Sequence, residues 1–160
     1  MKYKLFDIKD YKNLKGIMKE TEINRSHVIL RFIDFDFDPD EISNKLGLMP
    51  LSIAIQGEEY FAGPQKVSKK WEFNHWDYEL KMITNDFIGD TIDKFFKDII
   101  IPRLNDIKEI SQKTRITRLI IVQYYYTGHN PGYVFEKEKI KILADINAEI
   151  DMDVYCLGED

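Results

Sequence analysis

The stretch His27-Val-Ile-Leu-Arg-Phe-Ile-Asp-Phe-Asp-Phe37, followed directly by Asp38-Pro39-Asp40-Glu41, decides the fold. A continuous apolar run that turns into strict alternation predicts a strand whose first half is central in a sheet. Asp38 then stands where a helix N-cap is expected, with Pro39 at the first helical position and Glu41 completing a capping box. We therefore expect a strand and a short helix, which Gly47 ends in a left-handed conformation.

Outward from this stretch, the spacing of apolar residues predicts further elements. They are strands at 51–60 and 69–80, a helical segment from about 84 to 110, a strand at 118–127, a helix at 136–148 and a strand at 150–156. In the second of these strands Trp71, Phe73 and His75 alternate with Glu72, Asn74 and Trp76. The aromatic face therefore changes along the strand, which is typical of a bulge or of an exit from the sheet. Pro102 is expected to bend or divide the helical segment. Ile140 and Leu143 should face inward from the last helix, and Cys156 should be a small core residue.

The order of the elements is strand, helix, strand, strand, helix, strand, helix, strand, which is typical of an α+β domain. Its first six elements match the β-α-β-β-α-β arrangement of a ferredoxin-like sheet, and the last helix and strand extend that sheet. We expect the helices to pack mainly on one face. Residues 27–160 form this single domain, and residues 1–26 form an N-terminal extension with a short strand, a short helix after Asp10 and a linker.

The composition is that of a soluble globular protein, with 160 residues, 44% hydrophobic and 32% charged. No apolar run is long enough for a membrane span, and the start Met1-Lys2-Tyr3-Lys4 is not followed by a secretory signal, so we expect a cytoplasmic location. A single cysteine excludes an internal disulfide. The net charge of −5 argues against nucleic acid as the partner, because phosphate binding needs a basic surface. Abundant Ile, Lys, Asp and Asn with little Ala indicate an AT-rich genome and suggest a bacterial origin.

No motif in the chain predicts a metal centre. Asp34, Asp36 and Asp38 alternate at the end of the first strand, but a calcium loop of the EF-hand type would need Gly and Glu where Pro39 and Lys45 stand. We interpret these carboxylates as solvated, with Asp38 as the helix cap.

The three histidines, His27, His75 and His129, form no zinc-binding pair. His129 lies in the loop Gly128-His-Asn-Pro-Gly132 after a strand, where functional groups occur, although such residues are more often simple turn formers. The chain also contains no glycine-rich phosphate loop and no serine nucleophile motif. The sequence therefore predicts no catalytic residues and no cofactor, and leaves His129 as a candidate for binding only.

Aromatic side chains near strand ends are the other candidates for binding. Tyr124 and Tyr126 share one face of a strand while Tyr125 points to the other, so an open sheet face would present a pair of tyrosines. Trp71 follows three lysines, which either bind phosphate beside the indole or protect a sheet edge. The acidic residues around those lysines favour edge protection.

Several short motifs resemble those of one bacterial family. They are Arg31-Phe32 in the first strand, Asp38-Pro39-Asp40-Glu41-Ile42 leading to Leu46-Gly47-Leu48-Met49-Pro50, the pair Gly57-Glu58, Trp71, and the closing Ile150-Asp151-Met152-Asp153-Val154-Tyr155. Over residues of about 27–157 the chain resembles the family known as the domain of unknown function number forty-two seventy-nine. Most of the motifs are structural, and the resemblance implies no activity and no catalytic residues.

Two hypotheses for the function follow. The first is a small cytosolic binding module without catalytic activity that recognises another protein through an aromatic and acidic sheet face, for example an immunity protein that neutralises a basic toxin. The alternative is a small-molecule-binding protein or an enzyme with a pocket built from several strands, and a homodimer formed through sheet edges is compatible with either. The candidate binding residues are Arg31, Glu58, Trp71, Tyr124, Tyr126, His129 and Asp153. All of them except Tyr124 and His129 would converge in the pocket of the alternative hypothesis.

Overall fold

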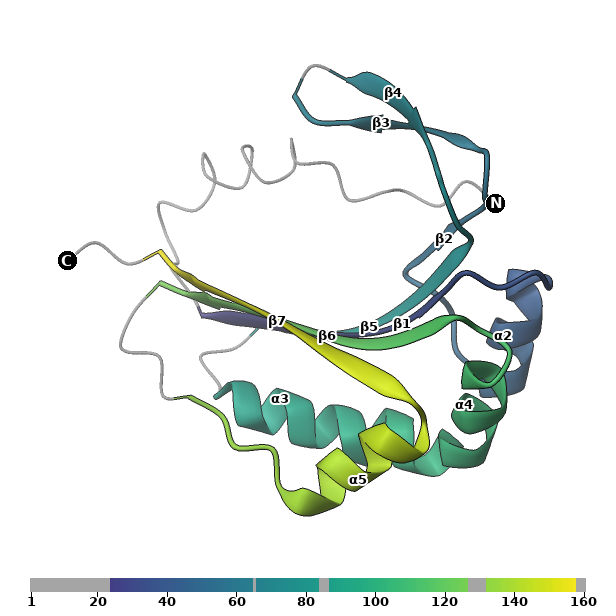
Figure 1. The fold of residues 1–160 in the computed structure, drawn as a ribbon. Helices are drawn as coiled ribbons and strands as arrows, with labels where there is room; N and C mark the ends of the chain where they lie inside the picture. The colour runs from purple at the N-terminus through teal and green to yellow at the C-terminus, as the bar shows by residue number, and fades with distance from the viewer. Residues whose placement is uncertain (1–23, 65, 84–86, 127–131, 158–160) are drawn as a thin grey trace.

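The computed structural model of the chain describes residues 24–64, 66–83, 87–126 and 132–157. They form an α+β structure with a mixed five-stranded sheet, in the order β2-β5-β1-β6-β7, and a separate two-stranded hairpin, β3-β4. Figure 1 shows the sheet with α3, α4 and α5 below it, α2 beside one end of it and the hairpin above it. The helix expected after Asp10 and the loop that contains His129 lie outside the described residues.

Strand β1 (Arg25–Ile33) lies at the centre of the sheet, antiparallel to both of its neighbours. Helix α2 (Pro39–Leu46) follows it, and the Asp38 side chain accepts a hydrogen bond of 2.9 Å from the backbone N–H of Asp40. Gly47 ends the helix with a φ of 62°. The central position of the strand, the N-cap and the glycine at the helix end are as the sequence predicts. The strand expected to run to Phe37 ends at Ile33 instead, because Asp34 has a φ of 62° that leaves the extended conformation.

The prediction of two long strands at 51–60 and 69–80 is wrong, because each is divided in two. The four shorter strands are β2 (Ser52–Ala54), β3 (Glu59–Ala62), β4 (Val67–Lys70) and β5 (His75–Ile83). Gly57 interrupts the first with a φ of 84°, which an extended strand does not allow. At the second break the Asn74 side chain accepts from the backbone N–H of Gln56 and donates to the Phe35 carbonyl, so these backbone groups are satisfied outside the sheet. The hairpin β3-β4 therefore leaves the sheet between these breaks, so that of the two interpretations of the aromatic switch, a bulge or an exit, the structure has the exit.

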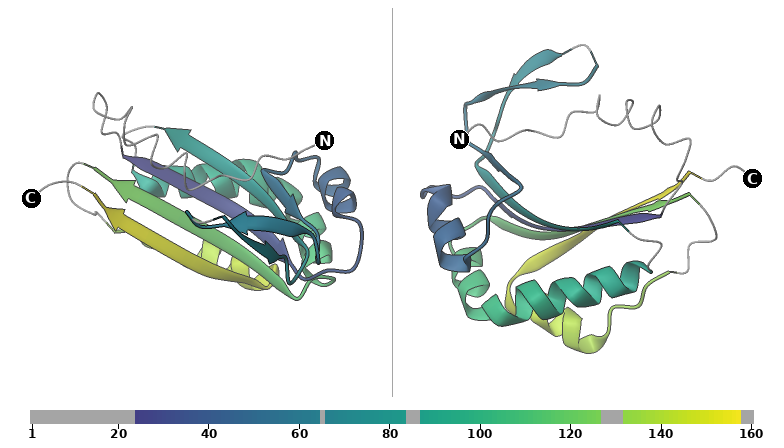
Figure 2. Two further views of the ribbon diagram at one scale, coloured as in Figure 1. Left: turned by 90° about the horizontal axis from the view of Figure 1, so that it is seen from above. Right: turned by 180° about the vertical axis from the view of Figure 1, so that it is seen from behind.

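The helical segment is divided around Pro102, as expected. It consists of α3 (Ile88–Phe95), a π-helical segment (Phe96–Ile100), a 3-10 turn (Ile101–Arg103) and α4 (Leu104–Ser111). Strand β6 (Ile116–Tyr125), helix α5 (Lys137–Asp145) and strand β7 (Ala148–Cys156) complete the chain, with β7 parallel to β6. The two views of Figure 2 show α3 and α5 on one face of the sheet and the β3-β4 hairpin on the other.

Two expectations about the last helix and strand are wrong. Ile140 is 53% exposed, because α5 turns the stripe Lys139, Ile142, Leu143 and Ile146 towards α3 and the sheet. Leu143 is buried, as predicted. Cys156 is exposed rather than part of the core, because it ends a strand at the edge of the sheet.

The hydrophobic core lies between the sheet and the helices. It takes alternate residues of the central strands, such as Leu30, Phe32 and Trp76, and packs them against α3 and the π-helical segment. The side chains between them point to the other face of the sheet, which the described helices leave uncovered. Within the described residues, no helix has the length and apolar character needed to cross a membrane.

Candidate functional site

We use the term open face for the side of the five-stranded sheet opposite α3 and α5. Strand alternation and register place on it every second residue of each strand. Its main polar and aromatic residues are Arg25, His27, Arg31, Asp77, Glu79, Arg118, Tyr124, Glu149, Asp151, Asp153 and Tyr155. Because the described helices pack against the other side, the open face is where the sheet gathers side chains that can act on a partner or a ligand.

One row of polar residues crosses all five strands of the open face. The register aligns Ser52, Asp77, Arg31, Arg118 and Glu149 from β2 to β7. The guanidinium of Arg31 donates two hydrogen bonds of 2.7 Å to the Asp77 carboxylate, which also accepts one of 2.9 Å from the Ser52 hydroxyl. The guanidinium of Arg118 donates to Glu149 at 2.8 Å and 3.2 Å. Every charge in the row therefore has a partner of opposite sign.

The centre of this row places two positive charges opposite each other. Arg31 and Arg118 are register partners on β1 and β6, an arrangement that costs stability unless other charges offset it. The two carboxylates on the outer sides of the pair, Asp77 and Glu149, supply that compensation. Asp77 is only 5% exposed, so its charge depends on the bidentate contact with Arg31.

Negative charge without an ion-pair partner gathers at β7. Asp151 and Asp153 are exposed, and neither forms an ion pair with any residue that the structure describes. On the same face, away from β7, Glu79 and Asp77 of β5 are paired with residues of β1. Glu79 contacts His27, and Asp77 contacts Arg31. On the open face Asp77 thus has a cationic partner in Arg31, whereas Asp151 and Asp153 on β7 have no ion-pair partner among the described residues.

An aromatic cluster lies at one end of the open face. Tyr124 on β6 stacks on Tyr155 of β7, with 5.0 Å between the ring centroids. The guanidinium of Arg25 lies 5.6 Å from the centroid of Tyr124, and it donates a hydrogen bond of 2.5 Å to the Tyr126 hydroxyl. Tyr125 points to the helix side and is buried, so the alternation predicted for the three tyrosines is confirmed for Tyr124 and Tyr125.

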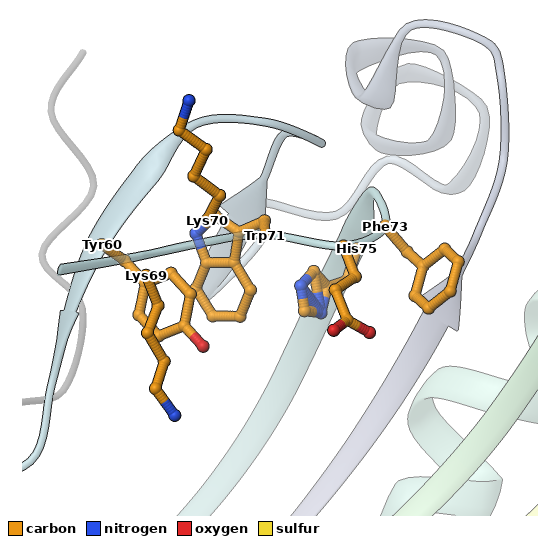
Figure 3. Close-up of a pocket in the computed structure, with 7 residues that line it drawn as sticks. Tyr60, Lys69, Lys70, Trp71, Phe73 and His75 are labelled. Carbon is orange, nitrogen blue, oxygen red and sulfur yellow. The ribbon is translucent and has the colours of Figure 1, made fainter. Parts of the chain in front are cut away.

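A pocket of about 580 Å³ lies where the β3-β4 hairpin joins β5 (Figure 3). It is lined by Tyr60, Lys69, Lys70, Trp71, Glu72, Phe73 and His75. Trp71 stacks on Tyr60 with 4.0 Å between ring centroids, and His75 packs at a right angle against Trp71 at 4.5 Å. These ring contacts join the hairpin to the sheet, and the stacking covers one face of the indole, which leaves less of Trp71 for a ligand.

His75 is a titratable residue of this pocket, and its imidazole is partly buried. Burial lowers its pKa below the ordinary value of 6.5, the charge of Arg31 acts in the same direction, and the charge of Asp77 opposes both. Its Nε2 atom is buried and has no hydrogen-bond partner within the part of the chain that is described. The imidazole is therefore neutral near pH 7.

Three of the predicted binding residues lie in the part of the fold near the hairpin. Arg31 is at the middle of the polar row, and Trp71 lines the pocket. Glu58 is exposed just before β3, and its carbonyl accepts a hydrogen bond of 3.0 Å from the backbone N–H of Trp71. The structure therefore brings Glu58 and Trp71 together at the base of the hairpin.

The other predicted residues lie elsewhere. Tyr124 and Tyr126 are at the opposite end of the open face, and both contact Arg25. Since Arg25 and Ile33 stand at opposite ends of β1 and Ile33 pairs with His75, about 25 Å of strand separates this cluster from the pocket. Asp153 is on β7 at the edge of the sheet, and His129 lies outside the described residues.

Sequence reasoning missed several polar and charged residues of the open face. His75, Asp77 and Glu79 alternate with aromatic or apolar residues, and Glu149 and Asp151 do the same on the strand that also holds the predicted Asp153. This period of two predicts a strand, and the charged members of the alternation are the signal that could have placed them on one surface. The partners in the polar row could not be predicted, because the register joins residues that are 46 positions apart, as in Arg31 and Asp77.

Two of the three carboxylates of the metal hypothesis have structural roles, and the third, Asp36, is exposed. Asp34 forms an ion pair of 2.8 Å with Arg115, and Asp38 caps α2. Across the described ranges, no group of three or more His, Cys, Asp or Glu side chains is arranged to hold a metal ion.

The chain belongs to the family described as Domain of unknown function (DUF4279), which it matches over residues 21–157. The match confirms the resemblance drawn from the motifs and begins a few residues before them. Comparison with curated proteins gave no match, and comparison with solved structures gave none. The description of the family gives no activity.

Proposed function

We propose that this DUF4279 chain is a binding module without catalytic activity, and that its open face recognises a basic protein. An immunity protein that neutralises a basic toxin, encoded beside its own gene, is the concrete form of this proposal. The proposal rests on one observation, the negative charge of Asp151 and Asp153, which have no ion-pair partner among the described residues. Such charge attracts a basic partner and raises the rate of association.

The aromatic cluster beside these carboxylates supports a protein partner. Tyrosine and arginine are enriched among the residues that contribute most to protein binding, and Arg25, Tyr124, Tyr126 and Tyr155 form one connected group here. Because stacking holds Tyr124 and Tyr155 in place before binding, little side-chain entropy is lost on association. Charge would therefore steer the partner, and the rings would supply contact area.

The experiment measures binding of the purified chain to the basic protein encoded beside its gene. We expect the Asp151→Asn, Asp153→Asn double variant to bind about ten-fold more weakly than wild type at low salt, mainly through slower association. The matched control is the double variant Glu138→Gln, Asp145→Asn, which removes two exposed charges from α5 and should bind as wild type does. Absence of binding by wild type, or equal weakening in both double variants, would contradict the proposal.

The second candidate function is binding of a small molecule in the hairpin pocket, as a carrier or an enzyme. The pocket volume is within the range of ligand sites, and the lysines Lys69 and Lys70 favour an anionic ligand. A thermal-shift screen of small anions and aromatic acids tests it. A ligand that stabilises wild type but not the Trp71→Leu variant would support this function, whereas a screen without hits would count against it.

The strand order β2-β5-β1-β6 supports our assignment of the core to the ferredoxin-like arrangement, with β7 added at one edge. A bacterial, cytoplasmic protein fits the low cysteine content and the proposed immunity role. Pairing of two copies through sheet edges is the alternative form of assembly, and light scattering distinguishes it from a monomer.

A further inference from the structure

Strand β7 ends the five-stranded sheet, and it has the features of an edge that accepts another strand. It is nine residues long and pairs with β6 on one side only among the described residues. Its sequence, Ala148-Glu-Ile-Asp-Met-Asp-Val-Tyr-Cys156, contains neither Pro nor Lys, and the charges it carries at this edge are all negative. With respect to the described part of the chain, the outer backbone groups of β7 are therefore open to pairing along the whole strand.

The direction of those backbone groups follows from one hydrogen bond. The backbone N–H of Leu157 donates to the Tyr125 carbonyl on β6 at 2.6 Å. Since the N–H and C=O of successive strand residues point to alternate sides, the odd-numbered residues of β7 pair with β6. The even-numbered residues, Met152 among them, direct their N–H and C=O groups outward.

The side chains along this edge form two stripes of different chemistry. On the helix side, Ile150, Met152 and Val154 are 44%, 45% and 42% exposed. On the open face, Asp151 and Asp153 carry negative charge with no ion-pair partner in the described ranges. A strand paired here would place one set of alternate side chains against apolar groups and the other set against carboxylates.

We propose that the basic partner adds a strand to β7, and that this strand alternates basic and apolar residues. Backbone pairing supplies affinity in this mode of recognition, and the alternate side chains supply specificity. Charge selects against a second copy of the chain as the occupant, because antiparallel pairing of two β7 strands would bring Asp151 and Asp153 close to their own copies. This inference deepens the proposed function and rests on it for the identity of the partner.

The test uses a defined probe, a fluorescent peptide of about eight residues in which lysine and valine alternate. Met152→Pro removes one outward N–H but leaves the β6-β7 hydrogen bonds intact, because the backbone groups of Met152 do not pair with β6. Met152→Ala is the matched control, since it shortens the same side chain and keeps the N–H. We expect the peptide to bind wild type and Met152→Ala, and to bind Met152→Pro about ten-fold more weakly.

Circular dichroism and thermal unfolding show whether Met152→Pro is folded. If it is not folded, hydrogen exchange of the wild-type chain replaces the binding measurement. The peptide should then protect the outward amides of β7 from exchange. Equal affinity of the two Met152 variants, protection elsewhere, or equal binding of a peptide with glutamate in place of lysine would overturn the inference. Dimerisation of wild type that Met152→Pro abolishes would also overturn it. If the protein partner binds both Met152 variants equally, the proposed function stands and the added strand does not.

Discussion

The two faces of the sheet use the same strands for different purposes. On the helix side, Leu30 and Trp76 are fully buried in the core. On the open face, one position away in the sequence, Arg31 and Asp77 form a charged pair that is partly accessible to water. The helix side of the sheet therefore determines the fold. The residues of the open face can vary in charge, as long as each buried charge keeps a partner of opposite sign.

The sharpest test of this difference compares neighbours on β1. Leu30→Ala should lower the free energy of unfolding by about 3 kcal/mol, because it leaves a cavity in a core that cannot collapse fully. Ile29→Ala, on the open face, should cost about 1 kcal/mol, because Ile29 is only half-buried. Chemical denaturation measures both. Equal losses would mean that the open face is packed as tightly as the core.

The Arg31-Asp77 pair should give the next largest effect. Asp77→Ala leaves the half-buried guanidinium of Arg31 without its bidentate partner and should cost about 2 kcal/mol. The double variant Arg31→Met, Asp77→Leu removes both charges together. Its loss of unfolding free energy should therefore be smaller than the sum of the losses of the single variants Arg31→Met and Asp77→Leu. Additive costs in a double-mutant cycle would show that the pair does not act as a unit.

The pH dependence of stability should report on His75. Its folded pKa is lowered, chiefly by burial, so the unfolded chain takes up a proton first as the pH falls below 6.5. The contribution of His75 to stability is therefore full above the unfolded pKa and is lost as the pH falls towards the folded pKa. Wild type should lose more unfolding free energy than His75→Gln in this window. Parallel pH profiles would show an imidazole that stays in contact with water.

The smallest effect is expected at the other end of the polar row. Arg118→Leu breaks an exposed ion pair with Glu149 but also removes the positive charge opposite Arg31. These two effects oppose each other, and the net change in unfolding free energy should lie within about 0.5 kcal/mol. Thermal unfolding measures it, and Lys137→Leu on the exposed side of α5 is the matched control for loss of a surface cation. A much larger loss in Arg118→Leu than in the control would show that the ion pair with Glu149 stabilises the β7 edge.

Local signals predicted the elements that local chemistry determines. Asp38, Pro39 and Gly47 act within a few residues of one another, and α2 begins and ends where they predict. The division of the strands after Ile55 depends instead on Asn74, which satisfies backbone groups of Gln56 and Phe35 from a distant position. Such contacts between distant segments have no signature in a local window of sequence.

In the candidate site, too, local features could be predicted from the sequence and contacts between distant segments could not. The alternation at Tyr124 and Tyr125 follows from strand geometry alone, and it could be predicted. The partners of Arg31 depend on register, which is fixed only when the sheet forms. The prediction for Ile140 is wrong because the direction in which α5 meets α3 is a property of packing between helices and not of the periodicity of one helix.

The central position of β1 has a consequence for synthesis on the ribosome. This strand emerges before both of its neighbours, and its contacts join Arg31 to Asp77, 46 residues later, and Arg25 to Tyr126, 101 residues later. Its backbone must therefore remain unpaired with them on both sides until β5 and then β6 have been made. A nascent chain that stalls between these two strands exposes an apolar strand with one free side, which is the kind of segment that chaperones bind and that aggregates with its neighbours.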